Sequence, residues 1–350
     1  MGQYLQEKYP KAHINCYDAA IGGTGSDLGM FRLERDVLKK KPDLVFLEFT
    51  VNDGCWSDNK DILFSYETIL RKLVSRGTAV EIVLLGVKDN YAQERYDSKV
   101  EKIVPCTLAD SKRRVQHLKL AESYQTAVAD TYPVMRSKVE NKEIDLAEVY
   151  CFEGTHPDNA GYELFFEIVK DGFNAAINDE KQCVVPEKII YGNVYDVQTR
   201  LCLRDTDLPK GWTVEKTFRT SAWFDGLSSR WMEDVAVFDV TKNQKPIPLK
   251  LEFEGTFLGV FGEADKNGLN FKILVDGKII KQIFKNSKTD VITEKEVWDY
   301  NRMKIVGRLF VWRKIANNLK PGKHTLEIVP VVPEGIKKGQ LRIESICFAE

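Results

Sequence analysis

The sequence predicts an α/β domain with a parallel sheet, followed by an antiparallel β-sandwich. In residues 1–182, apolar strand-sized segments alternate with amphipathic helical segments, which is typical of a sheet covered by helices on both faces. In residues 185–350, helical periodicity almost disappears and short segments of alternating polar and apolar residues follow one another. A length of 350 residues fits two domains or one large one, so this division is plausible by size.

Strands and helices are expected to alternate along the first domain. The expected strands are residues 13–20, 44–49, 80–87 and 127–129, and the expected helices are residues 2–9, 28–40, 61–75, 111–124 and 157–177. Residues 44–49 are almost entirely apolar, as in a parallel strand buried on both faces. Residues 88–110 and 130–150 show no clear periodicity. This order predicts three layers, α/β/α, joined by right-handed crossovers.

The second domain is expected to be a sandwich of the jelly-roll type. Residues 249–253 and 271–275 alternate between polar and apolar side chains, and Asp276-Gly277 is a hairpin turn signal. The domain boundary is expected near residues 181–187. Trp223 and Trp231 lie in a stretch rich in Ser, Gly and Asp, so they are candidates for a sugar-binding surface, whereas core packing explains most aromatic residues of a sandwich.

Composition excludes several classes of function. Hydrophobic residues make up 43% and charged residues 29% of the chain, as in ordinary globular proteins. The formal net charge is −1, from 51 basic and 52 acidic residues, so neither nucleic acid nor an anionic membrane surface is an expected partner. No apolar segment approaches the length of a membrane span, and no signal peptide is visible at Met1.

The 7 cysteines form no recognisable framework. Their number is odd, they are widely spaced and no CxxC pair occurs, which argues against a disulfide scaffold and against a zinc site. We expect most of them to be buried thiols. Cys183 and Cys202 are candidates for a disulfide if the compartment is oxidising.

Residues 153–161, Glu-Gly-Thr-His-Pro-Asp-Asn-Ala-Gly, place a histidine at the entrance of a helix. Pro157 fits the first turn of that helix, where its missing N–H is no loss. Glu153 lies three residues before His156 and can orient its ring, which is what a general base requires. The alternative interpretation is a capped turn with a surface histidine.

Two further loops of the α/β domain carry hydrogen-bond donors. Ligands of open α/β sheets bind beyond the carboxyl ends of the strands, where both loops are expected. Gly23 can present a backbone N–H and Asn52 a side-chain amide. Two such donors can stabilise the oxyanion of an acyl-transfer reaction, a contribution of about 3–4 kcal/mol for each donor in known hydrolases. With His156 and Glu153, they predict a site for acyl transfer.

Residues 17–53, which run from Tyr-Asp-Ala-Ala-Ile-Gly-Gly-Thr-Gly-Ser-Asp to Phe-Thr-Val-Asn-Asp, resemble the second and third sequence blocks of the SGNH/GDSL hydrolases. Residues 153–162 resemble the fifth block, and the resemblance covers about the first 180 residues. It implies a flavodoxin-like α/β/α fold, hydrolysis of acyl esters, and no metal or organic cofactor. It also implies site roles for four residues: oxyanion-hole donors Gly23 and Asn52, base His156, and orienting acid Glu153.

The sequence departs from the family pattern in its first block, which carries the nucleophilic serine. That block is expected well upstream of the second, yet only 20 residues precede Ile21 and none of them is serine. We therefore expect an N-terminally truncated domain that is inactive or nearly so by itself. Glu153 also replaces the usual aspartate, and Thr50 stands where glycine is commoner. Ser26 is an alternative nucleophile, although capping of the following helix by Ser26 or Asp27 is the expectation we favour.

The expected function is hydrolysis of an acyl ester, in particular removal of acetyl groups from a carbohydrate. A β-sandwich beside an SGNH-like domain resembles the layout of some polysaccharide-acting esterases. The expected partner is an acylated carbohydrate or another small ester. The alternative is a non-catalytic glycan-binding protein built on a degenerate hydrolase domain. The compartment stays open, with a periplasmic or secreted location expected for a full-length protein.

Overall fold

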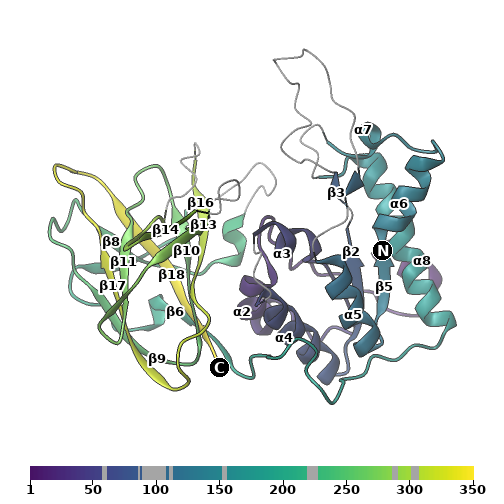
Figure 1. Cartoon of the computed structure of the whole chain (residues 1–350), viewed down its shortest axis with the longest axis horizontal. Coiled ribbons are helices and arrows are strands. Elements are labelled where there is room, and N and C mark those ends of the chain that lie inside the picture. Colours follow the sequence, from purple (N-terminus) through teal and green to yellow (C-terminus); the bar gives the residue numbers. More distant parts are fainter. Residues whose placement is uncertain are drawn as a thin grey trace, which may run out of the picture. The chain divides into compact units, whose positions relative to one another are not determined.

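The computed structural model describes residues 1–56, 61–85, 87–88, 108–109, 113–151, 156–218, 228–285, 291–300 and 307–350. The chain divides into two compact units, Met1–Ala19 with Gly23–Val194, and Ala20–Gly22 with Tyr195–Glu350 (Figure 1). Residues 179–197, between the last helix of the first unit and the first strand of the second, have no regular secondary structure. The predicted boundary near residues 181–187 lies in this stretch and stays a prediction.

The first unit contains a parallel sheet of three described strands in the order β1 (Leu44–Leu47), β2 (Ala79–Leu84) and β5 (Ala127–Asp130). Its helices pack around this sheet, as Figure 1 shows: α8 on β5, α4 and α5 on β2, and α2 on α4. The helices are α1 (Gly2–Lys8), α2 (Ser26–Asp36), η1 (Leu38–Lys40), α3 (Thr50–Trp56), α4 (Ile62–Ser75), α5 (Arg114–Tyr124), α6 (Thr131–Glu140), α7 (Leu146–Val149) and α8 (Asn159–Asn178). A short antiparallel pair, β3 (Val87–Lys88) and β4 (Leu108–Ala109), completes the described elements.

Close contacts in this unit depend on small residues. An added Cβ at Gly29 of α2 would lie 2.6 Å from the ring of Phe49, so glycine allows this helix to approach the segment that follows β1. An added Cβ at Gly172 of α8 would clash with the backbone oxygen of Val128 in β5. Glycine at these two positions therefore sets how closely the helices cover the sheet.

The predicted fold class is confirmed, and the structure corrects three of the expected elements. Residues 13–20 are not a buried strand: they have no regular structure, and Tyr17 is 62% exposed. A strand needs a hydrogen-bonding neighbour, and no described strand pairs with this segment. Residues 52–54 belong to helix α3 and not to a loop. Residues 130–150 contain α6 and α7, whose few buried positions explain the weak periodicity of the sequence.

The second unit is built from antiparallel strands, as predicted. One sheet has the order β16-β10-β18-β8-β7, with β6 also paired to β18, and the other has the order β12-β11-β17-β9, with β15 also paired to β11. The strands are β6 (Gln198–Cys202), β7 (Trp212–Glu215), β8 (Val235–Asp239), β9 (Leu249–Glu254), β10 (Phe257–Ala264), β11 (Phe271–Val275), β12 (Lys278–Ile280), β13 (Gln282–Lys285), β14 (Ile292–Lys295), β15 (Val297–Trp298), β16 (Leu309–Ala316), β17 (Lys323–Pro330) and β18 (Gln340–Ala349). Strands β13 and β14 form a separate hairpin, and the 3-10 turns are η2 (Leu203–Asp205) and η3 (Ser228–Trp231).

One hydrophobic core lies between the two sheets of this unit. Phe238 and Val260 of the larger sheet and Ile273 and Ile328 of the smaller one are all fully buried members of the same cluster. Trp212 and Trp298 are 5% exposed and belong to this core, which matches core packing as the usual role of sandwich aromatics. Trp223 lies outside the described residues.

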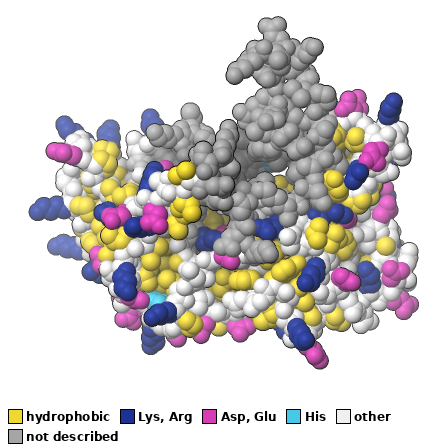
Figure 2. All heavy atoms as spheres, viewed as in Figure 1, with side chains coloured by type: hydrophobic (Ala, Val, Ile, Leu, Met, Phe, Trp, Pro, Cys, Tyr) yellow, Lys and Arg dark blue, Asp and Glu magenta, His cyan; other side chains and the backbone are white. Residues whose placement is uncertain are grey.

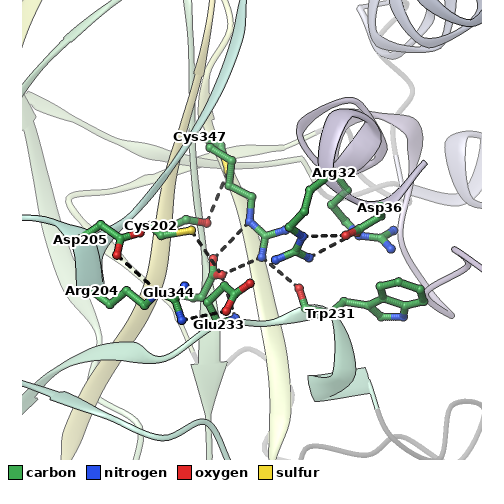
Figure 3. A network of polar contacts seen from close by, with 12 residues as sticks. Arg32, Asp36, Cys202, Arg204, Asp205, Trp231, Glu233, Glu344 and Cys347 are labelled. Atoms are coloured by element: carbon green, nitrogen blue, oxygen red, sulfur yellow. Dashed lines mark hydrogen bonds and ion pairs between the residues drawn. The ribbon is translucent and has the colours of Figure 1, made fainter. Parts of the chain in front are cut away.

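Two buried ion pairs lie on the larger sheet. Arg200 of β6 pairs with Glu344 of β18 at 2.7 Å, and Arg342 of β18 pairs with Glu263 of β10 at 2.8 Å. The guanidinium of Arg200 also donates to the carbonyl oxygen of Trp231 at 3.0 Å. Figure 3 labels Glu344 and Trp231, the two hydrogen-bond partners of this arginine. The second pair also makes a hydrogen bond to the backbone, because Glu263 accepts from the N–H of Phe218.

The candidate disulfide between Cys183 and Cys202 is not formed, because both are free thiols. The sulfur of Cys183 lies 3.5 Å from the backbone nitrogen of Val80, and that of Cys202 lies 3.9 Å from a carboxylate oxygen of Glu344. Each thiol is thus packed inside its own unit.

The charged surface is mixed, as the net charge of −1 suggests. On the face that Figure 2 shows, acidic and basic side chains are interspersed over the described residues. Within the described part of the chain, no helix has the combination of length and apolar character that a membrane crossing requires.

Candidate active site

Gly23 lies in the turn that precedes α2. Its φ of 73° is in the left-handed region, which glycine adopts without strain. Helix α2 begins at Ser26, with Gly25 as its N-cap and no side-chain cap from that residue. The helix thus starts two residues before the expected Leu28, and neither Ser26 nor Asp27 is its N-cap. The carboxylate of Asp27 nevertheless accepts from the N–H of Leu28 at 2.9 Å, while the N–H of Ser26 donates to Asp53.

Asn52 lies in the first turn of α3, just after the carboxyl end of β1. The carboxylate of Glu48 accepts a hydrogen bond from the backbone N–H of Val51 at 3.3 Å, at the start of this helix. The hydroxyl of Thr50 lies 3.3 Å from the carbonyl oxygen of Val83 in β2 and 3.2 Å from Nδ1 of His117. These contacts hold the helix that carries Asn52 against the sheet.

The carboxylate of Asp53 joins the Gly23 turn to the Asn52 helix. The backbone N–H of Ser26 donates to Oδ1 of Asp53 at 2.8 Å, and the Ser26 hydroxyl donates to Oδ2 at 2.7 Å. Both residues are fully buried, at 0% exposure. This geometry argues against Ser26 as the nucleophile, since its hydroxyl faces a buried carboxylate and is inaccessible to a substrate.

His156 lies in the connection between α7 and α8. Two backbone hydrogen bonds join the described residues on either side: the N–H of Cys151 donates to the carbonyl oxygen of His156 at 2.8 Å, and that of Asp158 donates to the carbonyl oxygen of Val149 at 2.9 Å. Asp158 is the N-cap of α8 and accepts from the N–H of Gly161 at 3.1 Å.

Pro157 precedes this cap, so the expectation that it stands in the first helical turn is wrong by two residues. Glu153 lies outside the described residues, and its predicted role beside His156 stays a prediction.

The packing of α8 shows to which end of the sheet His156 belongs. Gly172, near the C-terminal end of the helix, approaches Val128 of β5. Ile168, one turn earlier, packs with Val83 and Ala129, and Leu164, one turn earlier again, packs in the same cluster as Leu85. Toward its N-terminus, α8 therefore runs along β2 and β5 in the direction of their carboxyl ends.

The structure thus brings two of the predicted site residues to one edge of the sheet. Asn52 follows the carboxyl end of β1, and His156 precedes the helix that starts at the carboxyl edge of β2 and β5. The segment that contains Gly23 is linked to α3 by the two hydrogen bonds that Ser26 makes with Asp53. Loops at this edge form the binding sites of open α/β sheets.

A buried polar cluster lies beneath α3, and the sequence analysis did not anticipate it. Burial raises the pKa of Glu48 to about 7 and that of Asp53 well above its ordinary value, while backbone and hydroxyl donors act in the opposite direction. Burial, followed by the charge of Arg113, lowers the pKa of His117 to about 3, so this imidazole is neutral. Its ring stacks on Tyr66 at a centroid distance of 3.8 Å.

One sequence signal would have indicated this cluster. Glu48 directly follows an apolar strand of a buried sheet, and Asp53 lies in the helix after it, where a buried carboxylate is costly unless it has a hydrogen-bonding role. In the described residues, no group of three or more His, Cys, Asp or Glu side chains is arranged to hold a metal ion. Through Asp53 the cluster is hydrogen-bonded to Ser26 at the start of α2, and through Thr50 it reaches His117.

Residues 1–164 match the GDSL-like lipase/acylhydrolase family, so the first unit belongs to that family of hydrolases. The predicted resemblance to SGNH/GDSL hydrolases is confirmed by this match. A search of curated proteins finds no match to the chain.

Two solved structures resemble the whole chain. One is a two-domain esterase (CEX) active on acetylated mannans, with a TM-score of 0.69 and 19% identity, covering 99% of this chain and 84% of that chain. The other is the same kind of esterase co-crystallised with mannopentaose, with a TM-score of 0.69 and 18% identity, covering 99% of this chain and 83% of that chain. At such identity the likeness establishes the fold alone, which is an α/β domain with a parallel sheet followed by a domain of antiparallel sheets.

Proposed function

We propose that the protein is a carbohydrate esterase of the SGNH type, which removes acetyl groups from a polysaccharide such as mannan. The observation that carries the proposal is the placement of Asn52 and His156 at one edge of the parallel sheet, with Gly23 tied to Asn52 through Asp53. Family membership supports ester hydrolysis. The substrate class is suggested by the mannan-active esterases that share the fold.

The proposed reaction is acyl transfer through a serine nucleophile. The serine oxygen forms a bond to the acetyl carbon while His156 takes the hydroxyl proton, and the bond to the sugar oxygen then breaks as His156 returns that proton to it. Water repeats these steps and releases acetate. The backbone N–H of Gly23 and the amide of Asn52 donate to the oxyanion that forms in both steps, and Glu153 orients the imidazole.

The nucleophile is the part of the family pattern that residues 1–350 do not display. Ser26 is not this serine, because its hydroxyl is buried against Asp53. We propose that the reaction needs a serine from a first block of the family type. Because polysaccharides do not cross membranes, we also propose that the protein acts outside the cytoplasm.

The test is acetate release from acetylated mannan. Residues 1–350 are assayed alone and with a family-type first block joined to the N-terminus. We expect release only with the added block, and a loss of about 100-fold or more in kcat for His156→Ala and for Asn52→Ala. His13→Ala is the matched control, since His13 is an exposed histidine of the same unit.

Two outcomes would contradict the proposal. Acetate release that is unchanged in His156→Ala would remove the histidine from the reaction. Binding of mannan without acetate release in any arm, and without any effect of His156→Ala or Asn52→Ala on that binding, would favour the alternative of a non-catalytic glycan-binding protein.

A further inference from the structure

One carboxylate links the two segments that carry the proposed oxyanion donors. Asp53 is the neighbour of Asn52 in α3, and it accepts two hydrogen bonds from Ser26, three residues after Gly23. The Ser26 hydroxyl is also 3.2 Å from the carbonyl oxygen of Ile62 at the start of α4. A shift of either donor-bearing segment would therefore break contacts that no solvent can replace at 0% exposure.

The backbone at Gly25 approaches the Asp53 carboxylate so closely that it leaves no room for a side chain. An added Cβ at Gly25 would lie 2.8 Å from Oδ1 of Asp53, closer than such contacts are tolerated. Gly25 has φ −91° and ψ 178°, a conformation open to any residue. The need for glycine at this position therefore comes mainly from the approach of Asp53.

We propose that Asp53 is a positioning residue, whose bonds to Ser26 set the distance between the Gly23 N–H and the Asn52 amide. This inference rests on the proposed function, because it concerns the donors of that site. Asp53 does not touch the substrate and transfers no proton. Since oxyanion donors act mainly in the transition state, a misplaced donor lowers kcat more than it changes KM.

Substitutions at Asp53 and Ser26 distinguish positioning of the donors from a general contribution to stability. In Asp53→Asn, the amide oxygen can accept from the Ser26 N–H, and the amide nitrogen can donate to the Ser26 hydroxyl, which accepts as well as donates. All kinetics use the protein with the added first block, which the proposed function requires for turnover. In that protein we expect Asp53→Asn to keep kcat within about threefold of the unsubstituted form, and Asp53→Ala to lose about 10- to 100-fold with KM within about twofold. Ser26→Ala keeps one of the two bonds, so we expect a loss of about tenfold or less.

The matched control is Glu67→Ala. Glu67 is also fully buried, and its carboxylate accepts from the backbone N–H groups of Ile190 and Tyr191 at 2.8 and 3.0 Å, which belong to neither donor segment. It should lower stability as Asp53→Ala does, but leave kcat of the folded fraction unchanged. Gly25→Ala should reproduce the kcat loss of Asp53→Ala, because the added Cβ would clash with the Asp53 carboxylate. The double variant Gly25→Ala/Asp53→Ala lacks that carboxylate, so its kcat should fall no further than in either single variant.

A second measurement keeps the inference testable apart from catalysis. Amide hydrogen exchange of residues 23–26 should be at least about tenfold faster in Asp53→Ala, with residues 79–84 of β2 unchanged. If the protein with the added first block and all its variants release no acetate, the proposed function fails. The exchange rate alone then supports the link when it rises and overturns it when it does not. In an active protein, kcat unchanged in Asp53→Ala overturns the proposal, and complete loss in Ser26→Ala overturns it in favour of Ser26 as nucleophile.

Discussion

Glu81 is a buried carboxylate in the middle of the parallel sheet, and it should make the stability of the first unit depend on pH. It lies on β2 at 0% exposure, and neither of its oxygens has a hydrogen-bond partner among the described residues. An added Cβ at Gly172 of α8 would be 2.8 Å from Oε1, so the helix backbone covers the carboxyl group closely. Burial raises the pKa of Glu81 from 4.5 to about 8.

The direction of the effect follows from this raised pKa. Below about pH 4.5 the carboxyl group is protonated in both the folded and the unfolded chain, and its burial carries no charge. Between that pH and about pH 8, the unfolded chain releases the proton more readily, so the free energy of unfolding falls as pH rises. A difference of about 3.5 pH units corresponds to roughly 5 kcal/mol, lost progressively across this range.

The perturbation is Glu81→Gln, which removes the ionisable group and keeps the shape. Urea unfolding at pH 5 and at pH 9, followed by circular dichroism at 222 nm, measures the first unit, because the described α-helices lie there. We expect the unfolding free energy of the variant to exceed that of the wild type by several kcal/mol more at pH 9 than at pH 5. Glu122→Gln, at an exposed position of α5, is the control. An equal pH dependence in wild type and Glu81→Gln would refute the reasoning.

Three further predictions concern single contacts. His324 bonds through Nδ1 to Asp276 and through Nε2 to a backbone carbonyl, and these contacts raise its pKa despite burial. The sandwich should therefore lose stability as pH rises through this raised pKa, and His324→Gln should make its stability less dependent on pH. Melts followed by tryptophan fluorescence measure this, since five of the six tryptophans lie in the second unit. Glu344→Ala should destabilise the same unit by about 3–5 kcal/mol in urea, because it leaves Arg200 as a buried unpaired charge, whereas replacing both residues with methionine should recover most of this loss. Gly161→Ala should lower the melting temperature of the helical unit and the rate of acetate release together, since an added Cβ would clash with a backbone oxygen beside the start of α8, and an unchanged circular dichroism melt would contradict it.

The elements that the sequence predicted correctly are those whose own residues carry the full hydrophobic and capping pattern of a strand or helix. The strand within residues 44–49 is apolar throughout, and helix α8 has a capping aspartate and a continuous apolar face, so each could be recognised without its neighbours. Residues 13–20 show the limit of this reasoning. Their composition suits a strand, but a strand forms only where another strand pairs with it, and pairing is not encoded within the segment.

In the candidate site, too, local motifs were predictable from the sequence and long-range contacts were not. His156 and Asn52 were found from short motifs, because chemistry needs particular residue types at fixed spacing. The contact between Ser26 and Asp53 joins residues 27 positions apart and has no local signature. Helix α3 was missed because Asn52-Asp53-Gly54 is typical of a loop, whereas the carboxylate of Glu48 and the hydroxyl of Thr50 stabilise a helix there.

Helix α8 makes the position of His156 depend on residues far from it. From Asn159 to Gly172 the helix spans about 20 Å, and at Gly172 it lies directly against the backbone of β5. Because an α-helix is stiff over this length, a displacement of the helix at Gly172 also moves its N-terminus, next to His156. Random mutagenesis for altered turnover should therefore recover substitutions around Gly172 and Val128, where α8 contacts β5, as well as substitutions beside His156 itself.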